Sequence, residues 1–429
     1  TPPPPFITST LQQIANQKLG YSAKQTMRLA QILYEGVELG HHGAVGLITY
    51  MRTDSTNLSE KFLGDARAYI EKNYQKEYSL SAARTYKTKD SSAQEAHEAI
   101  RPTDPERTPE MLAQYLDPQA LKLYTLIWKR ALATQMADAV LGKTTLRIDI
   151  ADGDHTYTCK ATGQIIHFPG WLTLYPDALK EEHLPEVKEG AAVKNTKTEK
   201  QEHQTEPPSR YSDATLVKAL EEYGIGRPST YAPTIATIED RGYCERDEQK
   251  RLKPTTIAGI VNDLLVEHFP HIVDFQFTAM LEKDLDSIAK GEKEWQPIVK
   301  TFYEPFHAAI TEKTETLSRA ELSHTHLLGK DPNTGTDITV KIGRYGPYVQ
   351  RAAEKEEDKP QFAPIPKTMS LDAVTLADAL RFLSLPKIVG QDENGKDIRI
   401  AIGRFGPYVQ IEKTYYSIKG KEPYDITLS

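Results

Sequence analysis

The sequence has little cysteine, no excess of basic residues and no long hydrophobic run. Only Cys159 and Cys244 occur among 429 residues, and they form no CxxC pair. This excludes zinc ribbons and a disulfide scaffold, and it is typical of a reducing cytoplasm. No apolar run approaches the ~20 residues that span a bilayer, so we expect no membrane segment. The net charge of −7 argues against a nucleic-acid footprint over the whole surface but leaves room for a local basic groove.

The N-terminus has neither the basic nor the apolar region of a signal peptide. It reads TPPPPF, and four consecutive prolines are more typical of a cut within a longer protein than of a natural beginning. The length predicts two to four domains.

The first part of the chain, up to residue 138, has mainly helical periodicity. We expect two helices over 8–36, with Ser9 and Ser22 as their N-caps. A short strand over 44–50 follows, and a third helix begins soon after it.

Beyond residue 140 the period changes to that of strands. Alternating apolar residues up to Ile150, followed by Asp152-Gly153-Asp154, predict a β-hairpin. Residues 180–206 are rich in Glu and Lys and are expected to run over the surface, and helices return over 212–318, with Leu285 among the inward residues.

The C-terminal part holds an internal repeat. DITVKIGRYGPYVQ (337–350) recurs as DIRIAIGRFGPYVQ (397–410), with most positions identical. Each copy predicts a small β-containing module, and we expect the charged segment 351–367 to join the two.

Tyr50, in GLITYMRTDS (46–55), is the first candidate for chemistry. A phenol has a pKa near 10, so a tyrosine nucleophile needs neighbours that stabilise the anion or the transition state. Arg52 is suitable, because residues i and i+2 of an extended segment share a face and can address one phosphate. The alternative is a half-buried strand tyrosine beside a surface arginine, which is the commoner case for an isolated Tyr-x-Arg.

A second candidate is EAHEAIRPTD (95–104), where His97 and Arg101 stand one helical turn apart and could grip a phosphate at a helix end. The alternative is a helix terminus in which neighbouring glutamates pair with these cations.

A third candidate is GIGRPST (224–230), in which one helix stops and the next begins. Free backbone N–H groups at a helix start, together with Arg227 and the hydroxyls of Ser229 and Thr230, can seat an anion. An ordinary N-cap with an incidental arginine explains the stretch equally well.

The turns of the repeat are the fourth candidate. Their arginines and aromatic rings resemble base-stacking platforms beside phosphate contacts for single-stranded nucleic acid. The residues concerned are Arg344, Tyr345, Arg404 and Phe405. Alternatively, some of these rings fill a small core.

Taken together, GLITYMRTDST, EAHEAIRPT and the stretch Pro207 to Tyr243 closely resemble the type IA DNA topoisomerases, and among them the bacterial topoisomerase I group. The resemblance covers roughly residues 4–318. Segments 337–350 and 397–410 look like the repeats that follow the core in topoisomerases I without zinc ribbons.

The resemblance implies that Tyr50 attacks one strand of DNA and leaves a 5′-phosphotyrosine and a free 3′-hydroxyl. Arg52 would stabilise the charge on the phosphate. The residues implied to contact DNA are His97, Arg101, Arg227, Ser229 and Thr230. The implied outcome is ATP-independent relaxation of negatively supercoiled DNA by strand passage and resealing.

The Toprim domain of this family, with its acidic Mg²⁺-binding cluster, has no counterpart in the sequence. We therefore expect Mg²⁺ to belong to that missing region and no metal site in this chain. We expect the partners to be DNA, preferentially single-stranded, and the N-terminal Toprim region of the same protein, in the bacterial cytoplasm near the nucleoid. The chain alone is expected to have little or no relaxation activity.

Two other functions stay open. One is a non-catalytic module on the same scaffold that binds single-stranded DNA or docks a partner. The other, within the enzyme class, is topoisomerase III, although the tandem repeats favour topoisomerase I.

The expected fold is a multidomain α+β arrangement. Its parts are a helical domain carrying the tyrosine (6–138), a β-rich arch segment (139–206), a helical DNA-binding base (207–318), repeat 1 with its linker (319–367) and repeat 2 (368–429). In the family the arch flexes and separates the tyrosine domain from the base.

Overall fold

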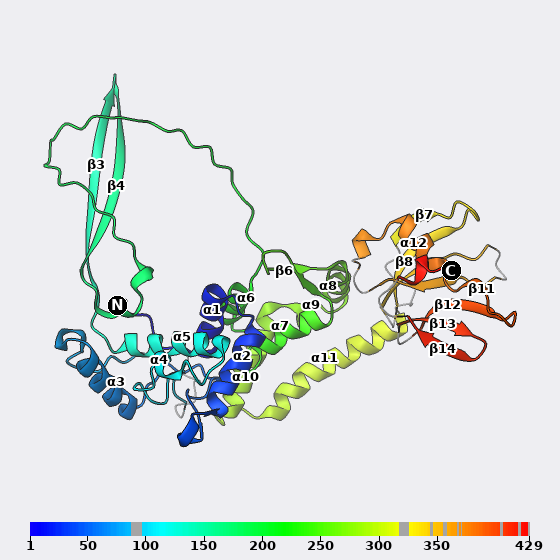
Figure 1. Cartoon of the computed structure of the whole chain (residues 1–429), viewed down its shortest axis with the longest axis horizontal. Helices are drawn as coiled ribbons and strands as arrows, with labels where there is room; N and C mark the ends of the chain where they lie inside the picture. Colours follow the sequence, from blue (N-terminus) through cyan, green and yellow to red (C-terminus); the bar gives the residue numbers. More distant parts are fainter. Residues whose placement is uncertain are drawn as a thin grey trace. The chain divides into compact units, whose positions relative to one another are not determined.

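The computed structural model (Figure 1) confirms a mixed fold of helices and small antiparallel sheets. It describes residues 1–86, 97–316, 326–343, 346–354, 358–366, 369, 371–403, 406–418 and 422–427. The chain forms two compact units. The first comprises Thr1–Asp240, Arg246–Lys253 and Thr278–Lys290, and the second comprises Arg241–Glu245, Pro254–Phe277 and Gly291–Ser429.

The first unit is built on a helical core. Its helices are α1 (Thr8–Leu19), α2 (Ala23–Glu35), α3 (Glu60–Asn73), α4 (Pro109–Leu112) and α5 (Pro118–Thr134). The longest of them, α5, buries Leu123, Tyr124 and Ile127 completely, in one hydrophobic cluster with apolar residues of α1, α2 and α3. Burial of this apolar stripe is what holds the short helices together.

Local capping chemistry sets several of the helix boundaries. The Ser22 hydroxyl accepts from the Gln25 N–H at the start of α2, and Gly20 ends α1 in the left-handed region with φ 69°. The prediction of Ser9 as an N-cap is wrong, because α1 begins at Thr8. The Thr8 N–H is satisfied by the Thr53 carbonyl at 2.9 Å, a tertiary contact that extends the helix beyond its local signal.

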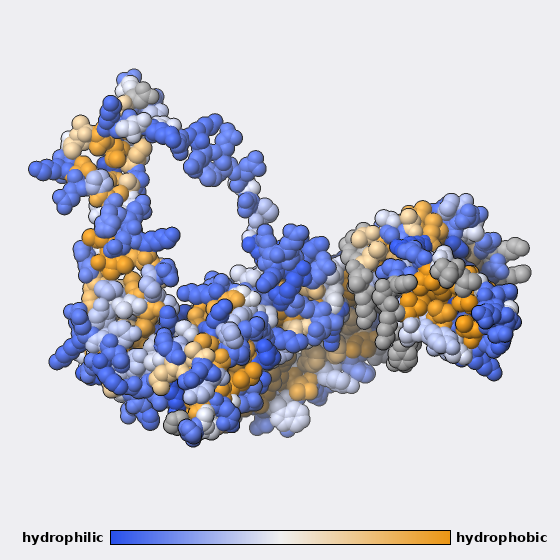
Figure 2. All heavy atoms as spheres, in the orientation of Figure 1, coloured by the Kyte–Doolittle hydropathy of each residue, from blue (hydrophilic) through white to orange (hydrophobic). Residues whose placement is uncertain are grey.

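The predicted hairpin is confirmed and is longer than expected. Strands β3 (Val140–Asp152) and β4 (His155–Phe168) pair in antiparallel register around Gly153, which has φ 59°. The 3-10 turns η3 (Gly170–Leu174) and η4 (Pro176–Ala178) follow. Residues 179–212 then return to the helices as a mostly exposed coil, which Figure 2 shows as hydrophilic, as expected from its composition.

Helices α6 (Asp213–Tyr223) and α7 (Tyr231–Asp240) complete the first unit together with most of α10 (Phe275–Ala289). Helix α6 packs on α1, and α7 packs on α2. Strands β5 (Cys244–Arg246) and β6 (Leu252–Pro254) form a small sheet beyond α7. The prediction that Leu285 faces inward is wrong, because its side chain is 52% exposed.

In its described residues the second unit contains helices followed by the two repeats. The helices are α8 (Thr256–His268), α9 (Pro270–Val273) and α11 (Trp295–Thr316). Phe302 and Phe306 of α11 stack with centroids 5.1 Å apart, and Phe269 packs on this pair. Within the ranges described above, no helix is long and apolar enough to cross a bilayer.

Each repeat forms a four-stranded antiparallel sheet, as the sequence pattern predicts. The strands are β7 (His326–Lys330), β8 (Asp337–Gly343), β9 (Gly346–Arg351) and β10 (Gln361–Pro364) in the first, and β11 (Lys387–Gln391), β12 (Asp397–Gly403), β13 (Gly406–Ile411) and β14 (Thr414–Ser417) in the second. The predicted linker 351–367 is partly a strand, because β10 pairs with β9.

The two sheets share a single hydrophobic cluster instead of forming separate cores. Val349 of the first repeat and Ile400 of the second are fully buried in it, together with Phe382 of α12 (Leu376–Leu383) and Ala363 of β10. A four-stranded sheet this small has little apolar surface of its own to bury, so sharing one core stabilises both repeats.

Candidate active site

The segment that carries Tyr50 is irregular, but backbone hydrogen bonds fix it on both sides. Before Tyr50, the Leu47 N–H donates to the Leu33 carbonyl at 2.7 Å, and the Thr49 N–H donates to the Arg101 carbonyl at 2.9 Å. The predicted strand over 44–50 is therefore wrong beyond β2 (Ala44–Val45), because the later residues bond to two different segments and not to one strand.

The same segment is fixed after Tyr50 by the start of α1. The Thr8 hydroxyl donates to the Met51 carbonyl at 2.7 Å, and the Thr53 N–H donates back to that hydroxyl at 2.8 Å. Met51 is 1% exposed and anchors the chain between two exposed neighbours, Tyr50 and Arg52. This alternation holds the backbone rigidly while two functional side chains stay accessible.

The Tyr50 ring lies at the surface against two other rings. It is 38% exposed, and its centroid lies 5.2 Å from that of Tyr34 and 6.3 Å from that of His97, both in edge-on geometry. Aromatic pairs prefer this arrangement, so the two neighbours restrict the directions that the phenol can take.

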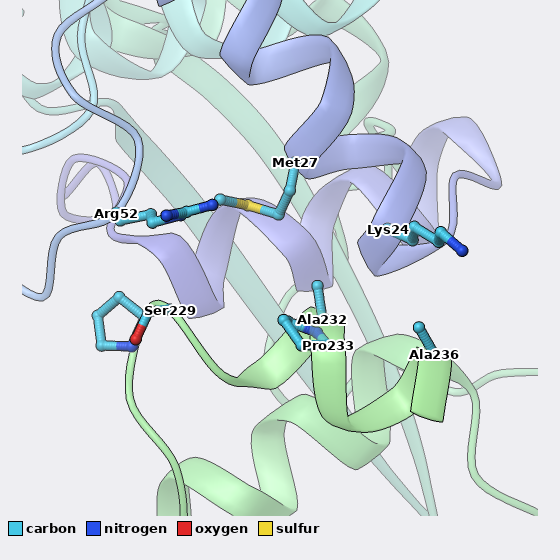
Figure 3. Close-up of a pocket in the computed structure, with 8 residues that line it drawn as sticks. Lys24, Met27, Arg52, Ser229, Ala232, Pro233 and Ala236 are labelled. Carbon is cyan, nitrogen blue, oxygen red and sulfur yellow. The ribbon is translucent and has the colours of Figure 1, made fainter. Parts of the chain in front are cut away.

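Arg52 lines a cavity of about 210 Å³ (Figure 3). The sequence did not predict this cavity. The lining residues are Lys24, Met27, Arg52, Pro228, Ser229, Ala232, Pro233 and Ala236. The cavity joins α2, the tyrosine segment and the GIGRPST loop with α7, although Arg52 and Ser229 lie far apart in the sequence. Tyr50 itself does not line it.

The chemistry of this cavity suits an anion with an apolar neighbour. Lys24 and Arg52 contribute positive charge, Ser229 contributes a hydroxyl, and no carboxylate is found among the described lining residues. Met27 and Ala232 give it an apolar wall. A sugar-phosphate backbone has this combination of charge and apolar surface. Lys24 was not predicted from sequence, and only its position on α2 relative to the loop reveals it.

The GIGRPST loop is closed by its own polar groups. The Thr230 hydroxyl accepts from the Arg227 N–H at 2.8 Å, and the Thr230 N–H donates to the Arg227 carbonyl at 2.8 Å. Gly226 has φ 83°, and a Cβ there would lie 3.1 Å from the Thr230 hydroxyl oxygen. The Thr230 hydroxyl therefore shapes the turn, while Ser229 remains exposed at the cavity.

The Arg227 guanidinium is paired with α10 instead of pointing freely at the cavity. It lies 2.6 Å from the Asp286 carboxylate and 3.7 Å from that of Glu282. Burial acts to lower the Arg227 pKa, but the hydrogen bond and charge of Asp286 raise it above its ordinary value. Arg227 thus stays charged and anchors the loop.

His97 and Arg101 are not on a helix, which corrects the sequence prediction. The Ala99 N–H donates to the Asn57 carbonyl and the Ile100 N–H donates to the Phe6 carbonyl. These backbone groups are bonded to other segments and not to a turn of helix. His97 reaches Tyr50 through this extended path.

The Arg101 side chain is 11% exposed and serves the fold. Its guanidinium lies 2.6 Å from the Glu98 carboxylate, donates to the Ser59 hydroxyl and covers the Phe62 ring at 4.8 Å. Arg101 thereby ties the segment after His97 to the start of α3.

In the repeats, Arg344, Tyr345, Arg404 and Phe405 lie outside the described residues. The described parts of the two sheets hold two edge-on aromatic pairs: Tyr348 with Phe362, whose centroids lie 5.6 Å apart, and Tyr408 with Tyr415, whose centroids lie 5.4 Å apart. Phe362 and Tyr415 are 58% and 62% exposed and occupy equivalent places in the two sheets, opposite Gln350 and Gln410. The sequence repeat ends before these two residues, so it gave no signal for them.

A divalent metal finds no suitable set of ligands in the described ranges. No three His, Cys, Asp or Glu side chains gather there in the way a metal site requires. Asp213, a buried carboxylate on α6, already accepts hydrogen bonds from Ala23 and Arg246. We therefore assign no step of the chemistry to a metal held by these residues.

Comparison with known proteins gives consistent matches over the whole chain. The family model described as DNA topoisomerase matches residues 1–300, and that described as topoisomerase C-terminal repeat matches residues 331–392 and 391–429. The chain is 42% identical over its full length to DNA topoisomerase 1 of Xylella fastidiosa, of which it covers 53%. Over 81% of the chain it is 46% identical to DNA topoisomerase 1 of Campylobacter jejuni, of which it covers 49%.

A solved structure is also similar. Full-length topoisomerase I from Thermotoga maritima superposes with a TM-score of 0.67 at 34% identity, over 86% of this chain and 59% of that one. The chain therefore spans about half the length of the curated relatives it matches.

Proposed function

Because the chain belongs to the DNA topoisomerase family, we propose that it is the strand-cleaving and strand-binding part of a type IA DNA topoisomerase I. The proposed activity of the whole protein is ATP-independent relaxation of negatively supercoiled DNA in the bacterial cytoplasm. The observation that carries the proposal is the placement of an exposed tyrosine, on a segment with fixed backbone, next to an arginine that lines a positively charged cavity.

In the proposed reaction the Tyr50 phenol oxygen attacks the phosphorus of one DNA strand. A bond forms between this oxygen and phosphorus, and the bond from phosphorus to the 3′ oxygen breaks. The phenol gives its proton up to solvent, and the 3′ oxygen gains one from a general acid, so the protons balance. Resealing is the reverse attack by the 3′-hydroxyl, in which these proton transfers are reversed. The number of phosphoester bonds does not change, so no ATP is needed.

The neighbouring residues have distinct proposed roles. Arg52 stabilises the negative charge that develops on the attacked phosphate, which is the usual contribution of a fixed cation to such a step. Tyr34 and His97 hold the Tyr50 ring in place by their edge contacts. Lys24 and Ser229 contact the adjacent strand backbone in the cavity.

Arg101, Arg227 and Thr230 act on DNA indirectly in this proposal. Their polar groups are engaged within the protein, with Glu98, with Asp286 and with the turn backbone respectively. They keep His97 and Ser229 in place. The two guanidinium charges also attract the DNA phosphates at long range.

The C-terminal repeats are proposed to bind single-stranded DNA. Exposed aromatic rings can stack on bases, and arginines in the same turns can contact phosphates. Phe362 and Tyr415 join the predicted residues Arg344, Tyr345, Arg404 and Phe405 as candidates.

The acid that protonates the leaving oxygen and the Mg²⁺ site are proposed to come from the Toprim region of the same protein. The half-length coverage of the relatives supports this, since their remaining length leaves room for another domain. This chain's own residues would then bind, orient and attack the strand.

The test uses single-stranded DNA labelled at its 3′ end and a denaturing gel. The chain is incubated with the labelled strand alone, and with a separately produced Toprim region and Mg²⁺. We expect label at the mass of the protein in the combined sample and none with Tyr50→Phe. No covalent label in any sample, with DNA still retained on a native gel, would favour the non-catalytic binding module instead.

A further inference from the structure

We propose that Asp213 is a latch that holds helices α1 and α2, which fix the segment of Tyr50, against α6 and α7, and that its release accompanies widening of the cavity between Arg52 and Ser229. The part of this inference that concerns strand passage rests on the proposed function. The latch itself is a property of the described structure and is testable without DNA.

Asp213 is the first residue of α6, and its carboxylate is shared between two partners. One oxygen accepts from the Ala23 N–H at 2.7 Å, and the other accepts from the Arg246 guanidinium at 2.6 Å. Arg246 also lies 2.7 Å from the Glu239 carboxylate near the end of α7. The Asp213 side chain is 1% exposed, so these bonds are shielded from water.

This placement stabilises the negative charge of the Asp213 carboxylate electrostatically. Ala23 is the first residue of α2, and its N–H has no partner within its own helix. Asp213 stands in the first turn of α6 as well, so a single negative charge lies near the positive ends of two helices. The Arg246 guanidinium supplies the balancing charge.

Two other polar contacts across the same interface are longer. The Asn16 side-chain oxygen accepts from the Ala214 N–H at 3.2 Å, and the Gln13 amide donates to Glu221 at 3.3 Å. Both are only partly buried. Val217 is fully buried in α6, which packs on α1. Asp213 is therefore the buried charged group that joins the two sides.

The latch is one residue away from the cavity. Ala23 precedes Lys24 on α2, whereas Ala232 and Ala236 line the opposite wall from α7. Parting α2 from α6 and α7 therefore separates the two walls, with Arg52 on one side and Ser229 on the other. Passage of a strand through a protein-bridged break requires such a separation.

A polar latch suits a contact that must open and close repeatedly. When it opens, the Ala23 N–H and one Asp213 carboxylate oxygen regain water while Asp213 keeps its pairing with Arg246, so the net difference between the states is modest. A purely apolar contact of the same extent would expose surface to water on each opening.

The structural test is hydrogen exchange of the chain, measured by mass spectrometry on the peptide that contains Ala23. Asp213→Ala should speed exchange of the Ala23 amide by about ten- to a hundredfold, the factor that corresponds to one lost charge-assisted hydrogen bond. Asp213→Asn should show a smaller increase, since it keeps an acceptor. Glu239→Gln is the matched control and should leave Ala23 unchanged, because Glu239 touches only Arg246 in this network.

Peptides from α5 report whether the fold itself is damaged. Unchanged α5 exchange with faster Ala23 exchange supports the latch. Unchanged Ala23 exchange in both Asp213 variants overturns it. An equal increase in the exchange rate of the α5 peptides also overturns it, because Asp213 would then stabilise the whole helical core.

The functional test uses the full-length protein and labelled DNA. Asp213→Asn should reseal the covalent complex about tenfold more slowly, because the open state lasts longer. Unchanged resealing would overturn the link to strand passage. Absence of any covalent complex in the unmodified protein would instead contradict the proposed function, while the exchange result would still decide the latch.

Discussion

The ring of Tyr34 stands edge-on to the ring of Tyr50, with centroids 5.2 Å apart and planes at 62°. Tyr34 belongs to the last turn of α2, and its carbonyl oxygen lies 2.8 Å from the point that a Cβ on Gly46 would occupy. One helical turn therefore positions both the backbone that leads to Tyr50 and the Tyr50 ring itself.

Tyr34→Ala should slow formation of the covalent DNA complex by about two- to tenfold, the range that corresponds to the energy of one edge-on aromatic pair. Tyr34→Phe keeps the ring and should stay close to the unmodified rate. The measurement is single-turnover cleavage of labelled single-stranded DNA by the full-length protein. A Phe variant as slow as the Ala variant would show that the hydroxyl matters and not the ring contact.

Gly46→Ala should destabilise the protein by about 1–3 kcal/mol, because the new Cβ would press against backbone that cannot move aside cheaply. Gly64→Ala is the matched control. Gly64 lies in α3 with nothing within 4 Å of its virtual Cβ, so alanine there should stabilise by about 0.5–1 kcal/mol. Denaturant unfolding measures both. Equal effects at the two positions would contradict the close approach at Gly46.

Arg52→Ala should reduce the rate of covalent complex formation by about 10²–10³-fold, as expected when one charge-stabilising donor is removed from an active site. Arg52→Lys keeps the charge but loses the planar, two-pronged geometry, so it should recover only part of the rate. Lys24→Ala is the comparison: it should weaken binding of the strand and leave the cleavage rate at saturating DNA largely intact. Loss of cleavage with Lys24→Ala at saturation would mean that Lys24 also acts on the reacting phosphate.

The Glu98–Arg101 pair predicts a pH dependence of stability. Burial acts to raise the Glu98 pKa, but hydrogen bonds from Arg101 and Ser59 outweigh it and lower that pKa below its ordinary value. A carboxylate with a lowered pKa in the folded state stabilises the fold above its unfolded pKa of about 4.3. This contribution is lost as the pH falls through the lowered value.

The measurement is the free energy of unfolding at several pH values from 7 to 3 for the unmodified chain and for Glu98→Gln. The variant should lose less stability over the acidic part of this range. Arg101→Ala should cost about 2 kcal/mol at neutral pH, less than a fully buried pair because Glu98 is a third exposed. Identical pH profiles for the two proteins would contradict the role assigned to this pair.

Much of the fold could be read from local sequence. The cap at Ser22, the turn at Gly153 and the alternation in the repeats each act over a few residues, so their outcome does not depend on distant parts of the chain. Three of the expectations that were wrong share the opposite feature. The start of α1, the end of β2 and the extended path of His97 are all decided by hydrogen bonds to other segments of the chain and not to near neighbours in the sequence.

The sequence alone determined which chemistry is available here: a tyrosine and an arginine two residues apart, a GIGRPST loop, and a repeated turn with rings and arginines. Residue types and short spacings carry that information directly. Only the tertiary structure decided how these groups are used, because free guanidinium groups cannot be told from paired ones in a sequence. It committed Arg101 and Arg227 to carboxylates, brought Lys24 to Arg52 and placed Asp213 between two helix ends, each a contact made by packing between distant segments.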